Sequence, residues 1–135
     1  MRKFLPKKEL QAAEALLEKL FTQIDGIKFA FLFGSALTEQ NPSDIDIAVM
    51  FDDDSFSLDG WIKLATQIEL QLLPIIHREA DCGALNNASL PLKYAASKGK
   101  LIYARTNEVY DWISLVHRMY YDRMHFYQNY IFGES

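Results

Sequence analysis

The sequence predicts an α/β (α+β) fold in which helices flank a small mixed sheet. Three observations bear in turn on the number of domains, the core and the fold class. The chain has 135 residues, which is typical of one domain, so residues 1–135 are taken as a single unit. Half of the residues are hydrophobic, enough for a core without disulfides. Short apolar runs alternate with segments of helical periodicity, the pattern of helices packed on a sheet.

The first half of the chain predicts helix, strand, short helical turn and strand. Residues 7–24 carry apolar side chains at helical spacing, and a following Asp-Gly pair ends that helix. Residues 27–33 form a continuous apolar run, which is typical of a strand buried on both faces. That strand stops at Gly34, a turn is expected over 35–38, and the second strand covers 44–51.

The second half predicts five further elements, in the order helix, strand, helix, strand, helix: 58–73, 78–85, 91–98, 100–104 and 107–132. Pro74 is expected to end the first of these helices, and Gly99 the second. Gly83 weakens the strand that contains it.

The predicted C-terminal helix has more aromatic residues than one core-facing stripe can bury. Tyr110, Tyr121, Phe126 and Tyr130 lie outside its main apolar stripe. The helix is therefore either a broad element of a small core or a surface on which a second protein docks, because aromatic residues are enriched at such interfaces.

Charge, hydrophobic pattern and cysteine content disfavour several classes of protein, although a small RNA end stays open as a substrate. The net charge is −4, whereas a nucleic-acid binder usually carries a basic face, so direct nucleic-acid binding is not expected. The longest apolar run is too short to cross a bilayer. The single Cys82 cannot form an intramolecular disulfide and suits a reducing, cytoplasmic location. It is interpreted as a small core residue.

The triplet Asp44-Ile45-Asp46 is the first chemical signal. Side chains alternate along a strand, so the two aspartates share one face and stand roughly 7 Å apart. At an effective dielectric constant of about 20 their repulsion is about 2 kcal/mol, which a bound divalent cation would turn into attraction. Oxygen ligands of this kind suit Mg²⁺ shared with substrate phosphates.

Gly34-Ser35 is the second signal, because it leaves a strand and enters a helical turn. A glycine lets a phosphate approach the backbone, and the amides that follow point towards it. Either motif alone is more often an ordinary turn or a solvated strand edge. Together, on a strand–turn–helix–strand frame, they predict a site for a nucleoside triphosphate and its metal.

Phe33-Gly34-Ser35 followed by Pro42-Ser43-Asp44-Ile45-Asp46-Ile47 resembles the signature of the polymerase-beta-like nucleotidyltransferases, and most closely their minimal MNT members. The resemblance extends from the first helix to about Arg105. It implies that Asp44 and Asp46 hold two Mg²⁺ ions and that Asp81 completes the site and takes a proton from the attacking hydroxyl. Many members have Val-Asp-hydrophobic where this chain has Ala-Asp-Cys-Gly, so Glu79 stays open as the alternative third ligand.

The resemblance also implies a reaction. MNT proteins of this size resemble the antitoxin half of HEPN/MNT toxin–antitoxin pairs, in which AMP passes from ATP to a tyrosine of the HEPN RNase toxin and silences it. Two alternatives stay open: a small-molecule nucleotidyltransferase of the aminoglycoside-modifying kind, and a non-catalytic antitoxin that acts by occlusion.

Several other polar residues do not form a recognisable site. The run from Asp52 to Asp54 is expected to be a solvated turn. His77, His117 and His125 are too dispersed for a zinc pattern, and the last two are expected at the surface or facing a partner. Arg78, Lys93 and Lys98 remain the candidate contacts to the triphosphate.

Overall fold

A four-stranded mixed sheet with helices on both faces forms the centre of the protein. The computed structural model describes residues 7–34, 45–54 and 57–131. The strands are β1 (Ile27–Phe33), β2 (Ile45–Phe51), β3 (Ala80–Ala84) and β4 (Lys100–Ala104), in the spatial order β3-β2-β1-β4. β1 is antiparallel to β2 and β4, whereas β2 and β3 are parallel. The predicted mixed α+β fold is confirmed.

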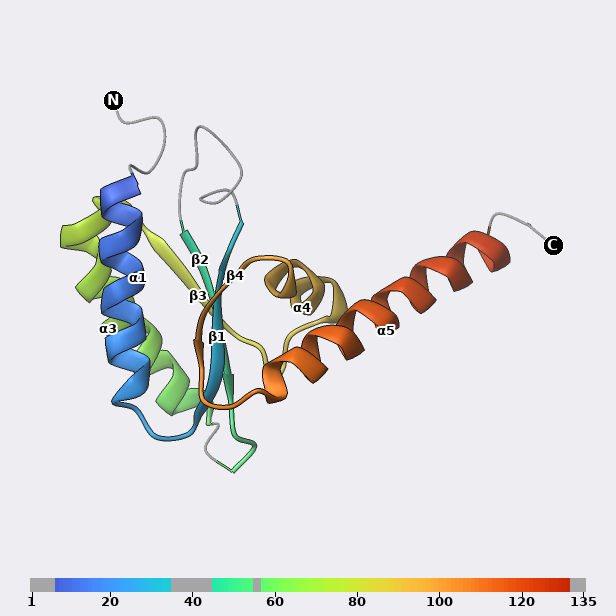
Figure 1. Ribbon diagram of the computed structural model, residues 1–135, viewed down its shortest axis with the longest axis horizontal. Helices are drawn as coiled ribbons and strands as arrows, with labels where there is room; N and C mark the ends of the chain where they lie inside the picture. The colour runs from blue at the N-terminus through green and yellow to red at the C-terminus, as the bar shows by residue number, and fades with distance from the viewer. Residues whose placement is uncertain (1–6, 35–44, 55–56, 132–135) are drawn as a thin grey trace.

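Four described helices cover the sheet, as Figure 1 shows: α1 (Lys7–Thr22), α3 (Leu58–Ile76), α4 (Leu90–Ser97) and α5 (Glu108–Ile131). α1 and α3 lie together on one face. α4 and the first turns of α5 lie on the other face. The helical turn expected over 35–38 lies outside the described residues.

The alternation of side chains along β2 divides the core between the two faces. Ile45, Ile47 and Val49 point to the face covered by α1 and α3, where they are fully buried. Ala48 points to the opposite face and packs there with Ala96 of α4 and other apolar residues. Asp46, two residues before Ala48, therefore belongs to the α4 face.

The predicted end of the helix before Pro74 is wrong, because α3 continues to Ile76 with the proline inside it. Proline removes one backbone donor from the helix. The last turn persists because Ile76 is fully buried, and because His77 adopts a left-handed conformation with φ of 55° and donates its N–H to the Leu73 carbonyl. Such a left-handed residue is a common helix end.

Several other boundaries differ slightly from the prediction. α1 ends at Thr22 and the third strand covers only Ala80–Ala84. Gly99 follows α4, but it is not a left-handed stop, because Lys98 already ends the helix in a right-handed conformation. A Cβ atom at Gly99 would instead overlap the Leu32 carbonyl oxygen, so glycine is needed there for close packing of the chain against β1.

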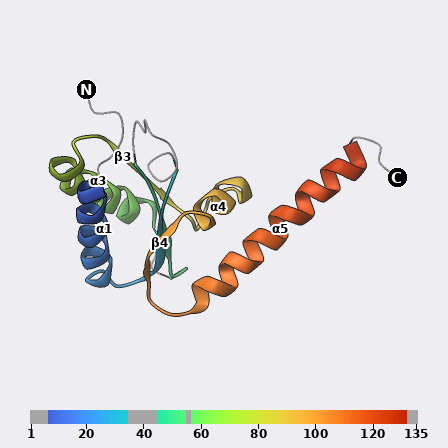
Figure 2. The same ribbon diagram turned by 45° about the horizontal axis from the view of Figure 1, so that its top comes forward.

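α5 changes character along its length. Its first half carries Val109 and Val116, which are buried, whereas every residue from 121 to 130 is exposed. Figure 2 shows this second half extending away from the rest of the molecule. Among the described helices, none is long and apolar enough to span a membrane.

Candidate active site

The end of β1 and the start of β2 bring Gly34 against the carboxylate of Asp46. Phe33 is paired with Asp46 across the two antiparallel strands, and Gly34 follows with a φ of 88°. A Cβ atom at position 34 would overlap Asp46 Oδ2 and lie 3.0 Å from its Cγ. This position therefore requires glycine for two reasons, its left-handed backbone and the space that the carboxylate occupies.

The parallel register of β2 and β3 sets Asp46 beside Asp81. Paired residues on neighbouring strands share a face, and the backbones of the two strands lie about 4.8 Å apart. Both aspartates line one cavity of about 200 Å³, which Phe33, Gly83 and Leu92 also border. The cavity thus lies between the end of β1, the edge strand β3 and helix α4, with two carboxylates in its wall.

Glu79, the alternative third ligand, does not border this cavity. It precedes β3, and its carbonyl oxygen accepts a hydrogen bond from the Ile45 amide. Together with Glu69 and Leu70 it lines a separate hollow on the α3 side. Asp81 borders both hollows and is the carboxylate in register with Asp46.

The oxygen donors at this site suit a hard cation such as Mg²⁺. Within the described residues, no group of three His, Cys, Asp or Glu side chains is arranged to hold a metal ion. Asp44 and Ser35, the two other predicted members, lie outside the described residues. The close contact between Gly34 and Asp46 nevertheless fits the expected arrangement, because it sets the backbone of the glycine turn directly beside a carboxylate that can share a metal with a phosphate.

Cys82 lies next to Asp81 but faces the core. It packs against the cluster under α1 and α3. Burial, together with the nearby negative charges of Glu69 and Asp81, raises the pKa of its thiol to about 12. A thiol with such a pKa is protonated at neutral pH and is a poor nucleophile, in agreement with its interpretation as a small core residue.

The acidic run after β2 is a turn, as predicted. Asp53 and Asp54 are exposed. Asp52 is held by Arg105, whose Nη1 and Nη2 donate hydrogen bonds of 2.6 and 2.8 Å to the two carboxylate oxygens. This pair, which the sequence did not reveal, ties the turn to the residue that follows β4, and it lowers the pKa of Asp52.

His117 is not a simple surface residue, which corrects the expectation for this position. It is half-buried, and its Nε2 lies 2.9 Å from Ser97 Oγ. Ser97 Oγ already donates its proton to the Tyr94 carbonyl, so His117 Nε2 is the donor to Ser97. The Tyr94 ring stacks on Tyr120 at 3.8 Å between centroids. These contacts fasten the middle of α5 to α4, whereas His125 is exposed as expected.

The three candidate cations lie on two segments, and none of them borders the cavity. Lys93 and Lys98 belong to or directly follow α4, the helix whose Leu92 borders the cavity. The Lys98 ammonium lies 5.0 Å from the centroid of the Tyr94 ring. Arg78 is half-buried shortly before β3.

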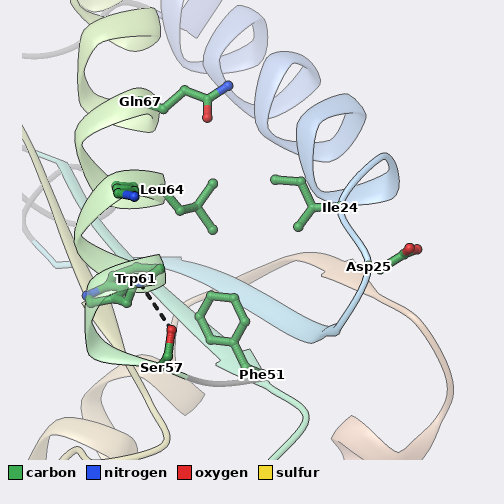
Figure 3. Close-up of a pocket in the computed structure, with 9 residues that line it drawn as sticks. Ile24, Asp25, Phe51, Ser57, Trp61, Leu64 and Gln67 are labelled. Carbon is green, nitrogen blue, oxygen red and sulfur yellow. Dashed lines mark hydrogen bonds between the residues drawn. The ribbon is translucent and has the colours of Figure 1, made fainter. Parts of the chain in front are cut away.

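Another pocket, of about 360 Å³, lies at the opposite end of the sheet and is shown in Figure 3. Phe51, Trp61 and Leu64 are among its apolar residues, and Asp25 and Gln67 are among its polar ones. Phe51 is the last residue of β2 whereas Asp46 is the second, so the two sites are separated by roughly 15 Å of strand. This pocket is therefore separate from the carboxylates.

A glycine turn thus packs on a strand carboxylate, and a second carboxylate lies in register beside it. Residues 16–108 match the family model described as polymerase beta, nucleotidyltransferase. The chain belongs to this nucleotidyltransferase family. A comparison with curated protein sequences gives no match.

Solved structures with the same fold come from toxin–antitoxin complexes. One is the complex of tri-AMPylated Shewanella oneidensis HEPN toxin with MNT antitoxin, which is 21% identical with a TM-score of 0.63, covering 92% of this chain and 96% of that chain. Another is the MntA–HepT toxin–antitoxin, at 21% identity and a TM-score of 0.62, covering 92% and 97%. A third, a toxin–antitoxin with AMP-PNP, is 20% identical with a TM-score of 0.62, covering 90% and 96%. These similarities establish the fold.

Proposed function

We propose that this protein is a Mg²⁺-dependent protein adenylyltransferase and the antitoxin of a toxin–antitoxin pair. It transfers AMP from ATP to a tyrosine hydroxyl of a cognate HEPN-type toxin and so neutralises the toxin. The observation that carries the proposal is the packing of Gly34 against Asp46, with Asp81 in register beside it. The relatives of the same fold and nearly the same length support the choice of partner and nucleotide.

Each site residue has a part in this proposal. The turn at Gly34 and Ser35 holds the triphosphate through backbone amides and the serine hydroxyl. Asp44, Asp46 and Asp81 hold Mg²⁺, which would neutralise the charge of the phosphates when bound. The tyrosine oxygen forms a bond to the α-phosphorus while the bond to pyrophosphate breaks. Asp81, an exposed carboxylate beside Asp46, accepts the proton that the tyrosine hydroxyl loses.

We propose that residues 1–135 form one catalytic domain. The cavity beside Asp46 and Asp81 is small, about 200 Å³, and lies at the edge strand β3. A partner protein therefore has to present its hydroxyl at this edge from outside. The long helix α5 is the proposed docking element, since its second half is exposed.

The decisive experiment measures the intact mass of the HEPN-type partner after coexpression with the tagged chain. The wild-type chain should add whole AMP units to the partner, whereas Asp44→Ala/Asp46→Ala should add none. The matched control is Asp53→Ala/Asp54→Ala, which removes two exposed carboxylates from the turn after β2 and should transfer AMP normally.

The outcomes separate the three hypotheses. An unmodified partner that stays bound and inhibited in both samples would refute transfer and support occlusion. A partner that neither binds nor gains mass, together with adenylylation of a small hydroxyl compound such as an aminoglycoside, would support the small-molecule alternative. Full transfer by the double aspartate variant would contradict the assignment of the site.

A further inference from the structure

The second half of α5 has a surface that is unusually apolar for an exposed helix. This distal segment, residues 121–130, is exposed at every position. Half of its ten residues are large and apolar or aromatic, with exposed fractions between 45% and 76%: Tyr121, Met124, Phe126, Tyr127 and Tyr130. An isolated helix of about this length is marginal in water, so a helix of this composition gains much of its stability from a covering surface.

These five side chains spread around the helix rather than forming one stripe. At about 100° per residue, Tyr127 continues the buried line of Val109 and Val116, whereas Phe126 lies about 100° away from it. Met124 and Tyr121 extend the apolar surface on the other side, so that it spans roughly 220° of the circumference. A single packed helix covers a stripe of about 100°. At least two elements are therefore needed to cover the distal segment.

One flank of the segment has the shape that receives a side chain from another helix. Asp122, His125, Phe126 and Asn129 occupy positions i, i+3, i+4 and i+7, and with Tyr130 they border a shallow hollow. Four residues at this spacing form the hole into which a side chain of a facing helix inserts. The rim is ordered by a 2.9 Å contact between His125 Nε2 and Asn129 Nδ2, and by stacking of Phe126 on Tyr130 at 5.1 Å.

We propose that the distal segment of α5 inserts into a groove between two helices of the protein acceptor. This inference rests on the proposed function, since it names the surface that holds the acceptor. The exposed apolar side chains of the segment, together with Leu115 and Met119, offer roughly 700–900 Å² at about 100–130 Å² each. That is close to the area of about 800 Å² that one partner contributes to a stable protein complex.

The position of α5 connects this docking to the catalytic site. Its first turns pack on the same face of the sheet as Ala48, which is also the face of Asp46. Figures 1 and 2 show the distal segment extending outward from that side of the molecule. A protein held on this segment is thus on the side of the sheet where Asp46 and Asp81 border the cavity.

Other occupants fit the segment less well. Pairing with α5 of a second copy would cover one stripe and leave the rest of the 220° surface exposed. A membrane-surface helix normally carries several Lys or Arg residues on its polar face, whereas this segment has Arg123 alone.

The test measures the affinity of the coexpressed HEPN-type partner for the tagged chain in an Asp46→Asn background, so that transfer does not alter the partner during the measurement. Phe126→Ser/Tyr130→Ser should weaken binding by about 30-fold or more, because such aromatic residues are typical hot spots. Tyr110→Ser, which removes a 58%-exposed tyrosine from the first turn of α5, should bind within about twofold of the parent chain.

The outcomes distinguish this inference from the proposed function. Equal affinity of the Phe126/Tyr130 variant and the Tyr110 variant would overturn the docking, even if the wild-type chain adds AMP. Selective loss of binding, without any AMP on the partner of the wild-type chain, would support the docking and refute the transfer. If the free chain is a dimer that Phe126→Ser/Tyr130→Ser makes monomeric, with unchanged partner affinity, the segment pairs with a second copy and the proposal is wrong.

Discussion

Substituting Gly34 by alanine tests the geometry of the site directly. The backbone of Gly34 has a φ of 88°, and a Cβ atom there would overlap Asp46 Oδ2. The substitution therefore introduces two separate penalties. One is backbone strain at position 34, and the other is displacement of the Asp46 carboxylate.

The size of each penalty follows from the structure. An L-residue in the left-handed region costs about 1–2 kcal/mol. Moving Asp46 from its preferred rotamer adds about 0.5–1.5 kcal/mol. The free energy of unfolding should thus fall by about 1.5–3.5 kcal/mol, which lowers Tm by roughly 6–14 °C for a chain of this size. A displacement of about 1 Å at a reacting centre can reduce the rate about 100-fold, so transfer should fall at least that much.

The assay combines urea unfolding with the rate of AMP transfer to the partner. Gly83→Ala is the matched control, because Gly83 also borders the cavity, yet a Cβ atom there would meet no atom within 4 Å in the described residues. This control should leave stability unchanged or slightly higher, since alanine replaces glycine within a strand. In an Asp46→Ala background, Gly34→Ala should cost only the backbone strain, and the difference between the two backgrounds measures the contact.

Two results would refute this reasoning. If Gly34→Ala has the stability and transfer rate of the wild type, the glycine turn does not hold the carboxylate as the structure shows. If it costs the same free energy with and without the Asp46 side chain, the penalty is backbone strain alone and the contact has no energetic weight.

Three further predictions concern individual contacts elsewhere in the fold. Gly99→Ala should destabilise the fold by about 1–3 kcal/mol in urea unfolding, because its Cβ would overlap the Leu32 carbonyl, which is backbone and cannot rotate away; an unchanged midpoint would contradict this. Cys82 has a pKa of about 12, so little of its thiol is ionised at pH 8. It should therefore react with iodoacetamide roughly a thousandfold more slowly in the folded chain than in urea. Similar rates in the two states would disprove its burial. Arg105→Ala should lower the free energy of unfolding at neutral pH but not in strong acid. The hydrogen bonds from Arg105 lower the pKa of Asp52, and the resulting stabilisation is lost as the pH falls below 3.8 through the lowered pKa. An equal loss of stability at both pH values would exclude the ion pair as its cause.

The sequence predicted the elements well where hydrophobic pattern decides the structure. Residues 27–33 form the predicted strand, because a continuous apolar run suits a strand in the middle of a covered sheet. Residues 100–104 also form the predicted strand, which lies at the edge of the sheet. The end of α3 was predicted wrongly at Pro74. Local propensity favours a stop at proline, but the burial of Ile76 two residues later outweighs it.

Spatial neighbours were harder to predict than elements. The alternation within β2 gave the face of Asp46, but sequence alone does not set the strand order or the register of β3. The pairing of Asp46 with Asp81 is a long-range feature that the resemblance implied and the parallel register provides. The role of His117 was missed for the same reason, since its partner Ser97 lies on another helix.

Within the part of the chain that the structure describes, the unequal burial of the two faces of β2 follows from the lengths of the elements that cover them. α4 has eight residues, about 12 Å, whereas the seven residues of β2 extend over about 23 Å. A helix this short covers Ala48, which is 2% exposed, but leaves Asp46 only half-buried. On the opposite face, the 16-residue α1 and the 19-residue α3 are long enough to bury Ile45, Ile47 and Val49 completely. Among the described residues, the same strand is thus fully buried on the face of α1 and α3 and leaves Asp46 partly accessible on the other face.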